Sequence, residues 1–486
     1  MSKNENNGGS RGREARRKFR VLELFCGCGG LSHGFFNTGD FEIVGGVDLK
    51  EEALETFRRN HKNSRGNAPE IVRGDIREIE IHDLQECLGQ GGVVEQELDC
   101  LIGGPPCQGF SQLRRSKERE NNRIVRFRGY NRLDEDPRND LVLRFLEIAE
   151  ALRPKIIVIE NVPQMMLHAH KGVDGGLATQ IMSLLGEMEY AVVEGVLNAA
   201  NFGVPQIRDR VFIIASRVGK PSLPSSTHAD PSKADMFQSK LLPWVTVGEA
   251  ISDLPNAPLG SADKLGGGAV SLYAKREPSR FAERMRSARH FPYNHIARQY
   301  EKSVISLIEH MQCGETWDDA SARMRQKYDM LIKSEKRPGE DAARCRARLI
   351  ETGAINASFY KKYYWSAYTR LDRERPALTI TANANFLGSG RFTHPQNDRG
   401  ITMREAARLQ SFEDEFTFLT SVGTKDLTTN IGVGLDMIGE AVPPLLAEAI
   451  ARSVQGLLTK AEGGVSGGRG RNAAAGKEPV VSKENV

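Results

Sequence analysis

Short apolar runs alternate with amphipathic stretches between residues 19 and 216. Leu141–Leu152 carries apolar residues at helical spacing and predicts a helix. Runs of aliphatic and β-branched residues predict strands at Val21–Phe25, Ile43–Val47, Cys100–Ile102, Ile156–Ile159, Val192–Leu197 and Val211–Ala215. Strands that alternate with helices indicate the α/β class, with a doubly wound and mostly parallel sheet.

The pattern changes after residue 219. Residues 220–265 are rich in Pro and Ser, and residues 276–348 are polar and charged, with basic residues recurring on mixed helical segments. The chain looks compact again from Leu371 to Gln455 and closes with an amphipathic helix at Leu445–Leu458. We therefore expect a larger domain from 19–219 plus 392–462, a smaller domain from 220–391, and disordered polar tails at 1–18 and 463–486.

Composition adds limits to this picture. Hydrophobic residues make up 39% of the chain and charged residues 27%, as in an ordinary soluble protein. No apolar run approaches the roughly 20 residues of a membrane helix, and the start lacks the core of a secretory signal, so we expect a cytoplasmic protein. The net charge of +4 permits a polyanionic partner only if basic residues cluster.

Seven cysteines without repeated spacing argue against a disulfide framework. Cys26 and Cys28 have no second Cys/His pair nearby in the sequence, so we expect no metal site.

The end of the first strand has the features of a ligand-binding loop. It leads into Cys26-Gly27-Cys28-Gly29-Gly30 and then a helix starting near Leu31. Glycines let a backbone pass close to a ligand, and helix-terminal N–H groups can face its polar groups. Asp48 ends the second strand, where a carboxylate can accept both hydroxyls of a ribose, and Asp75 offers another acid. The alternative is that Asp48 and Asp75 are ordinary loop acids.

Three further loops carry reactive groups. Gly103-Gly104-Pro105-Pro106-Cys107-Gln108-Gly109-Phe110-Ser111 follows an apolar strand, so Cys107 is well placed as a nucleophile, or else is a buried inert thiol. Glu160-Asn161-Val162-Pro163 follows the strand at Ile156–Ile159, where a carboxylate could bind or protonate a substrate. In Gln206-Ile207-Arg208-Asp209-Arg210 the two arginines alternate and predict anion binding on one side.

Together these motifs resemble those of the bacterial DNA (cytosine-5)-methyltransferases, over residues 19–453. The glycine loop resembles the family's cofactor loop, Gly103 to Ser111 its catalytic loop, Glu160-Asn161-Val162 its acid motif and Gln206 to Arg210 its arginine motif. Arg404-Glu405-Ala406-Ala407-Arg408-Leu409-Gln410 matches a segment near its target-recognition region, and Ile438 to Ala447 its closing segment. All six motifs occur in the family's order.

The resemblance implies transfer of a methyl group from S-adenosyl-L-methionine to carbon 5 of a flipped-out cytosine in double-stranded DNA. Cys107 would add to carbon 6, Glu160 would hydrogen-bond the ring, and Arg208 and Arg210 would lie near the base and phosphates. The implied cofactor-binding residues are Phe25, Gly27, Cys28, Gly29, Gly30, Asp48, Leu49, Asp75, Ile76, Leu141, Glu440, Ala441 and Val442.

Four positions depart from the family pattern. Asp48 stands where Glu is usual, Leu49 where an aromatic residue is frequent, Glu413 where Pro is usual, and Glu440 where Asn is usual. We expect Glu440 to point to solvent or to a neighbouring Lys or Arg, at little cost.

The resemblance also assigns the smaller domain to target recognition, with its DNA-reading loops in residues 293–364. Basic and aromatic residues interleave at Tyr360–Trp365, which suits phosphate and base contacts, although a solvated helix and a core edge explain them equally well. The implied partner is double-stranded DNA, with a cognate restriction endonuclease on the same site as an open question, and we expect a monomer.

Three other functions fit the sequence less well. Methylation of tRNA is disfavoured by the DNA-type Gly109-Phe110-Ser111 and by the long region between Arg210 and Leu371. A non-enzymatic DNA-binding relative is disfavoured because the reactive residues are all present. A nicotinamide-dependent dehydrogenase would leave Pro105-Pro106-Cys107 unexplained.

Overall fold

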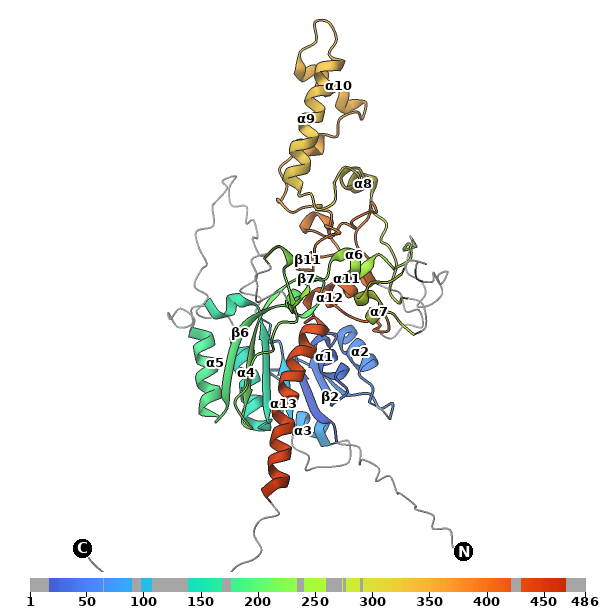
Figure 1. The fold of residues 1–486 in the computed structure, drawn as a ribbon. Coiled ribbons are helices and arrows are strands. Elements are labelled where there is room, and N and C mark those ends of the chain that lie inside the picture. The colour runs from blue at the N-terminus through green and yellow to red at the C-terminus, as the bar shows by residue number, and fades with distance from the viewer. Residues whose placement is uncertain are drawn as a thin grey trace, which may run out of the picture.

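Seven strands form the central sheet of the protein, which we describe from a computed structural model (Figure 1). The structure describes residues 17–63, 65–89, 98–106, 139–167, 176–233, 240–258, 273, 277–288, 292–420 and 430–468. In sheet order the strands are β3 (Glu70–Arg73), β2 (Phe41–Asp48), β1 (Phe19–Leu24), β4 (Cys100–Gly103), β5 (Ile156–Asn161), β8 (Asp209–Ser216) and β6 (Ala191–Asn198). Only β8 runs against its neighbours in this sheet. The predicted α/β class with a mostly parallel sheet is confirmed.

Helices cover both faces of the sheet. Phe19 and Val21 of β1 face the cluster that contains α1 (Gly30–Asn37) and α2 (Glu51–Asn60). Leu22 and Leu24 face the opposite cluster, with α3 (Ile81–Gly89), α4 (Asn139–Leu152) and α5 (Gly176–Glu187). Because the central strands are buried on both faces, they appear in the sequence as continuous apolar runs.

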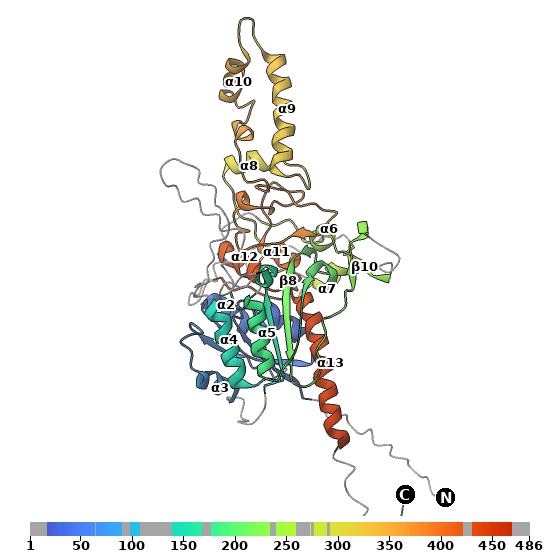
Figure 2. The same ribbon diagram turned by 90° about the vertical axis from the view of Figure 1, so that its left-hand side faces the viewer.

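The last helix, α13 (Pro444–Gly468), returns to the sheet and packs along α1 (Figures 1 and 2). A Cβ atom on Gly34 would lie 2.4 Å from the Cβ of Ala447, so the glycine is what lets the two helices approach. The helix predicted at Leu445–Leu458 exists and packs beside the sheet, whereas the division into two lobes stays a prediction.

Short elements fill the space above the carboxyl edge of the sheet. Gln206–Ile207 (β7) pairs in parallel with Ala377–Leu378 (β11), and His228–Ala229 (β9) pairs with Leu242–Pro243 (β10). The helices here are α6 (Val247–Ile251), α7 (Arg280–Met285), α11 (Met403–Leu409) and α12 (Ile431–Glu440). Their apolar residues join the cluster on the α1 side of the sheet. The core therefore continues across residues 219 and 391, and the predicted division into two domains there stays a prediction.

A helical extension projects beyond these elements (Figures 1 and 2). It consists of α8 (Lys302–Ile308), α9 (Trp317–Glu335) and α10 (Ala342–Glu351). Thr316 and Asp319 form a capping box that starts α9. The extension has a separate apolar core that includes Trp317 and Phe359. The sequence indicated mixed helical segments here, but it did not predict that α9 and α10 pack against each other.

Both predicted tails need their boundaries corrected. Arg17 was assigned to the first tail, but its guanidinium lies 2.8 Å from the buried carboxylate of Asp99. The helix α13 continues to Gly468, past the predicted end at residue 462. No helix within the described residues has the length and apolar character needed to cross a membrane.

Candidate active site

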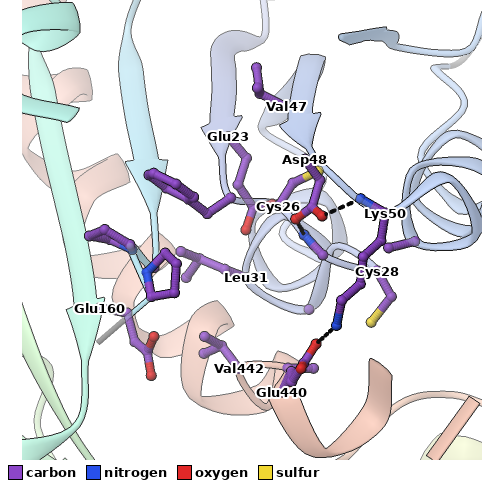
Figure 3. Close-up of a pocket in the computed structure, with 18 of the residues that line it drawn as sticks. Glu23, Cys26, Cys28, Leu31, Val47, Asp48, Lys50, Glu160, Glu440 and Val442 are labelled. Atoms are coloured by element: carbon purple, nitrogen blue, oxygen red, sulfur yellow. Dashed lines mark hydrogen bonds and ion pairs between the residues drawn. The ribbon is translucent and has the colours of Figure 1, made fainter. Parts of the chain in front are cut away.

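A cavity of about 460 Å³ opens at the carboxyl ends of β1, β2, β4 and β5 (Figure 3). The sheet order reverses direction between β1 and β4, which is where doubly wound sheets bind their ligands. The volume lies within the range of small-molecule and cofactor sites. Among the predicted site residues, those that line the cavity are Phe25, Gly27, Cys28, Gly30, Asp48, Leu49, Asp75, Ile76, Leu141, Glu160, Arg208, Arg210, Glu440, Ala441 and Val442.

The β1–α1 loop requires glycine at three positions for different structural reasons. Gly27 has left-handed backbone angles and open space around its Cα, so it leaves room in the cavity. A side chain on Gly29 would meet His61, and one on Gly30 would meet the carbonyl of Val442. The first glycine is therefore the one suited to a ligand, whereas the other two allow protein packing.

Asp48 holds the loop together as well as facing the cavity. Its carboxylate accepts hydrogen bonds from the backbone N–H groups of Gly27 at 2.8 Å and Lys50 at 2.9 Å. Each carboxylate oxygen has a second lone pair, so Asp48 can still accept hydrogen bonds from a ligand. Leu49 beside it is 61% exposed, which leaves a large apolar side chain without protein cover at the cavity wall.

Asp75 and Ile76 form another part of the wall. The side chain of Arg77 donates to the Asp75 carboxylate, and these hydrogen bonds lower the pKa of Asp75 to about 2. Ile76 is buried in the core on the α4 side and presents an apolar surface.

Glu23 is a cavity residue that the sequence analysis missed. It is buried, and its Oε2 accepts hydrogen bonds from the backbone N–H and the hydroxyl of Ser32. Burial raises the pKa of Glu23 to about 8, although Ser32 opposes the rise. The available signal was an acid inside the otherwise apolar run Val21–Phe25.

Glu160 and Arg210 form an ion pair inside the cavity, with Arg210 Nε 2.8 Å from Glu160 Oε1. Burial raises the pKa of Glu160, and the two arginines Arg210 and Arg208 oppose that rise. A Cβ atom on Gly104 would lie 2.8 Å from Glu160 Oε2, so this glycine lets the carboxyl group lie directly against the loop.

Asn161, also missed as a site residue, fixes the same loop. Its side-chain amide donates to the carbonyl of Pro105 at 3.0 Å. Cys107 follows Pro106 in the sequence and lies outside the described residues, as do Gln108 to Ser111. The structure thus brings Glu160 to the beginning of the predicted catalytic loop, and the position of the thiol stays a prediction.

Arg208 lies at the cavity wall, and its buried Nε has no hydrogen-bond partner among the described residues. Its two terminal nitrogens donate to the carbonyls of Ile380 at 2.8 Å and Gly439 at 2.9 Å. This geometry ties three segments together at the cavity, so Arg208 is suited to positioning them.

The two cysteines of the first loop are not suited to act as nucleophiles, because a nucleophile must be a thiolate. Burial raises the pKa values of Cys26 and Cys28, which keeps both as thiols near neutral pH. The described residues contain no group of three His, Cys, Asp or Glu side chains that could hold a metal ion.

Glu440 pairs with a lysine across the mouth of the cavity. Its Oε2 lies 2.7 Å from Lys50 Nζ, and both side chains are about half exposed (Figure 3). The expectation that Glu440 meets solvent or a basic neighbour is confirmed. Glu413, the other unusual acid, accepts hydrogen bonds from His33 Nε2 at 2.7 Å and Asn37 Nδ2 at 2.6 Å, and so ties α1 to the segment after α11.

Comparison with known proteins identifies the family. The family model described as C-5 cytosine-specific DNA methylase matches residues 19–456. The chain belongs to this family. It is therefore a DNA (cytosine-5)-methyltransferase, as predicted, and it acts by methyl transfer to carbon 5 of cytosine in DNA.

Individual relatives agree with the assignment of this methylase. It is 28% identical to the type II methyltransferase M.DdeI of Desulfomicrobium norvegicum over 437 residues, which cover 89% of the chain and 88% of the relative. It is 36% identical to the type II methyltransferase M.AquIA of Picosynechococcus over 251 residues, which cover 50% of the chain and 92% of the relative. A crystal structure described as a DNA modification methyltransferase from an Escherichia coli prophage has the same fold, with a TM-score of 0.59, 22% identity, and coverage of 91% and 100% of the two chains.

Proposed function

We propose that this methylase transfers a methyl group from S-adenosylmethionine to a flipped-out cytosine, in a specific double-stranded DNA site, through a covalent adduct at Cys107. The observation that carries the proposal is the buried Glu160–Arg210 pair, set against Gly104 three residues before Cys107. We extend the proposal to residues 220–391 as the domain that recognises the DNA site. A cognate restriction endonuclease on that site would fit the type II names of the relatives.

The cavity suits S-adenosylmethionine. It has the volume of a cofactor site, with hydrogen-bond acceptors at Asp48 and Asp75 for ribose and adenine groups and an apolar wall at Ile76. The open space at Gly27 would accept the methionine end. When bound, the cofactor supplies an electrophilic methyl group.

The chain's own residues prepare the cytosine. The Cys107 thiolate would form a bond to carbon 6, and the electrons of the C5–C6 double bond would then move toward carbon 5 and the ring nitrogen. Glu160, whose raised pKa favours the protonated form, would donate its proton to that nitrogen. Arg210 at 2.8 Å would stabilise the carboxylate that remains.

The product forms when the adduct collapses. After carbon 5 has taken up the methyl group, its proton leaves to a base, and the C–H electrons re-form the double bond as the bond from carbon 6 to Sγ breaks. The ring nitrogen returns its proton to Glu160, and the thiolate of Cys107 and 5-methylcytosine are released. Because carbon 6 is inaccessible in a stacked duplex, the base must first leave the helix.

A trapping experiment tests the nucleophile. Duplex DNA with 5-fluorocytosine at the methylated position should form an adduct that survives denaturation, because the fluorine cannot leave as the proton does. Cys107→Ser should abolish the adduct and lower turnover by orders of magnitude, since an alcohol ionises far less than a thiol at neutral pH. Cys345→Ser, at a buried thiol of α10 outside the cavity, is the matched control and should still trap. An adduct that persists in Cys107→Ser would contradict the assignment.

The acid has its own test. Glu160→Gln should slow single-turnover methyl transfer by about a hundredfold or more, the usual contribution of a general acid, while cofactor affinity stays near normal. Equal single-turnover rates for the two proteins would remove Glu160 from the mechanism.

A further inference from the structure

The cavity wall formed by Asp75 and Ile76 belongs to a turn at the edge of the sheet. Within the described residues, β3, the strand before this turn, pairs only with β2. The turn is closed by hydrogen bonds from the backbone N–H groups of Glu78 and Ile79 to the carbonyl of Asp75, at 2.8 and 3.2 Å. Because an edge strand has a neighbouring strand on one side only, the position of this turn depends on contacts from other elements.

Arg144 of α4 supplies such a contact. Its Nε donates to the carbonyl of Ile76 at 3.2 Å, and its Nη2 donates to the carbonyl of Ile79 at 2.8 Å. The remaining nitrogen, Nη1, donates to Glu147 at 2.9 Å, one turn further along α4. A guanidinium is a rigid, planar fork of donors, so three partners together fix its orientation. Arg144 therefore ties the turn to α4 at two carbonyls.

The helix α4 is itself fixed at the cavity. Leu141, one turn before Arg144 on the same face of the helix, lines the cavity. Phe145 is buried against the end of β4, where a Cβ atom on Gly103 would lie 3.0 Å from its ring. The position of Arg144 is thus set by the central part of the sheet, and the arginine extends that support to the edge.

The carboxylate of Asp75 can distinguish two purine rings. Its hydrogen bonds with Arg77 keep it ionised, and an ionised carboxylate only accepts hydrogen bonds. Adenine has an exocyclic amine, which donates, whereas hypoxanthine has an oxygen on the same carbon, which accepts. A site that presents an acceptor at this place favours the amine and disfavours the oxygen. This selectivity depends on where the turn holds the carboxylate.

We propose that Arg144 is a positioning residue for the cofactor, which holds the turn so that the Asp75 carboxylate meets the adenine amine. The proposal rests on the proposed function, because it requires an adenosyl cofactor in the cavity. Arg144 does not line the cavity, so it acts through the turn and not by touching the ligand. Selectivity for adenine over hypoxanthine is the property that it controls.

Calorimetric titration of the full chain with S-adenosylhomocysteine and with its deaminated analogue, S-inosylhomocysteine, measures this selectivity. The parent should bind the adenosyl compound at least about tenfold more tightly, since a hydrogen bond to a charged group contributes about that factor. Arg144→Met should weaken binding of the adenosyl compound by about tenfold and leave binding of the inosyl compound unchanged. The unchanged binding would also show that the variant is folded.

A second variant tests whether the two residues act together. Asp75→Asn should lose the same preference, because its amide can also donate to the oxygen of hypoxanthine. The double variant should bind the adenosyl compound no more weakly than Asp75→Asn alone, since the arginine acts only through this carboxylate. Arg144→Lys keeps the charge and can still donate to a carbonyl, so it should recover part of the preference.

Methylation kinetics add a separate measurement. With DNA that the protein methylates, Arg144→Met should raise the KM for S-adenosylmethionine by about tenfold and leave kcat near that of the parent. The matched control is Arg153→Met, at a mostly exposed arginine just beyond α4 that pairs with Glu189. It should behave like the parent in every measurement.

The outcomes separate this role from a purely structural one. Equal weakening of both compounds in Arg144→Met would mean that the arginine only stabilises the fold, and would overturn the proposal. A preference that is unchanged in Arg144→Met, or absent from the parent, would overturn it as well while leaving the proposed function intact. A parent that binds neither compound would overturn the proposed cofactor site, and the role of Arg144 with it.

Discussion

The sheet and the segment from residue 370 to residue 418 share an apolar core but differ in the charged side chains that they bury. The strands of the sheet fill its two faces with aliphatic and aromatic residues. The other segment buries four arginines, at positions 370, 399, 404 and 408. Both regions border the cavity elements, so two different kinds of interaction hold one site.

The difference follows from how the backbone N–H and carbonyl groups of each region find hydrogen-bond partners. Strands pair their own N–H and carbonyl groups, so their side chains can be apolar. The segment from 370 to 418 is largely irregular, and its carbonyls need other donors. Arg404 donates to the carbonyls of Tyr293, Glu413 and Phe416, and Arg370 donates to those of Ile308, Met311, His394 and Asn397. In this segment a buried arginine supplies the hydrogen-bond donors that a neighbouring strand supplies in the sheet.

The largest effect should come from breaking the buried charges. Arg408 lies 2.6 Å from both Asp253 and Asp414, and its side chain has no exposed surface. Arg408→Met would remove the guanidinium that these two buried carboxylates share, although Asp253 keeps Arg286 and Asp414 keeps Tyr273. It should cost about 3–5 kcal/mol of the free energy of unfolding. Denaturant unfolding would measure it.

The control is an ion pair between an arginine and a glutamate at the surface. Arg452 is 2.6 Å from Glu448 on α13 and is mostly exposed. Arg452→Met should change the free energy of unfolding by less than about 1 kcal/mol. If the two variants were equally stable, the arginines between residues 370 and 418 would not hold the irregular backbone as described.

A pH experiment examines the acid in the apolar sheet. The pKa of Glu23 in the folded protein is about 8, above the ordinary value of 4.5. The folded state therefore keeps a proton that the unfolded chain releases. Its contribution to stability is full below pH 4.5 and is lost as the pH rises toward 8, by at most about 1.4 kcal/mol per pH unit.

Glu23→Gln should remove this loss, because the amide oxygen can still accept from Ser32 and carries no charge. The melting temperatures of the two proteins between pH 5 and pH 8 would show it. The parent should lose stability relative to the variant as the pH rises, and parallel curves would mean that Glu23 is not neutral in the folded state.

The smallest effect is expected at the mouth of the cavity. The ion pair between Lys50 and Glu440 is half exposed, and such pairs contribute between zero and about 1 kcal/mol. Glu440→Asn should therefore change cofactor and DNA affinity by less than tenfold, with Lys50→Gln as the matched variant. Calorimetric titration at two salt concentrations would measure this, and a gain of tenfold or more would show that the pair restrains binding.

The same contrast decides what the sequence could predict. The six predicted strands all exist. Burial on both faces gives the central strands continuous apolar runs that are readable without a structure, whereas β6 at the sheet edge is only partly buried. The predicted residues at the ends of β1, β2 and β5 meet at the cavity because parallel strands end at one edge, and Arg210 joins them from the start of the antiparallel β8. The glycine loop was predicted for ligand contact, yet Gly29 and Gly30 are required by packing.

The rest depends on partners far apart in the chain. A buried arginine and a solvated one look alike in a sequence, so the positions of Arg404 and Arg408 could not be read from it. The pairing of Lys50 with Glu440 joins residues 390 positions apart. The bond from Asn161 to Pro105 likewise depends on two strands being neighbours.

The reversed direction of β8 has a mechanical consequence. A parallel strand in its place would bring its last residues to the cavity edge, whereas β8 brings its first, so the chain enters the site immediately after β7. β7 pairs with β11, and Ile380, two residues after β11, accepts a hydrogen bond from Arg208. Arg210 lies three residues after β7, so a shift of this strand pair would reach it directly. A change in this pairing would therefore alter the position of the Arg210 guanidinium relative to Glu160.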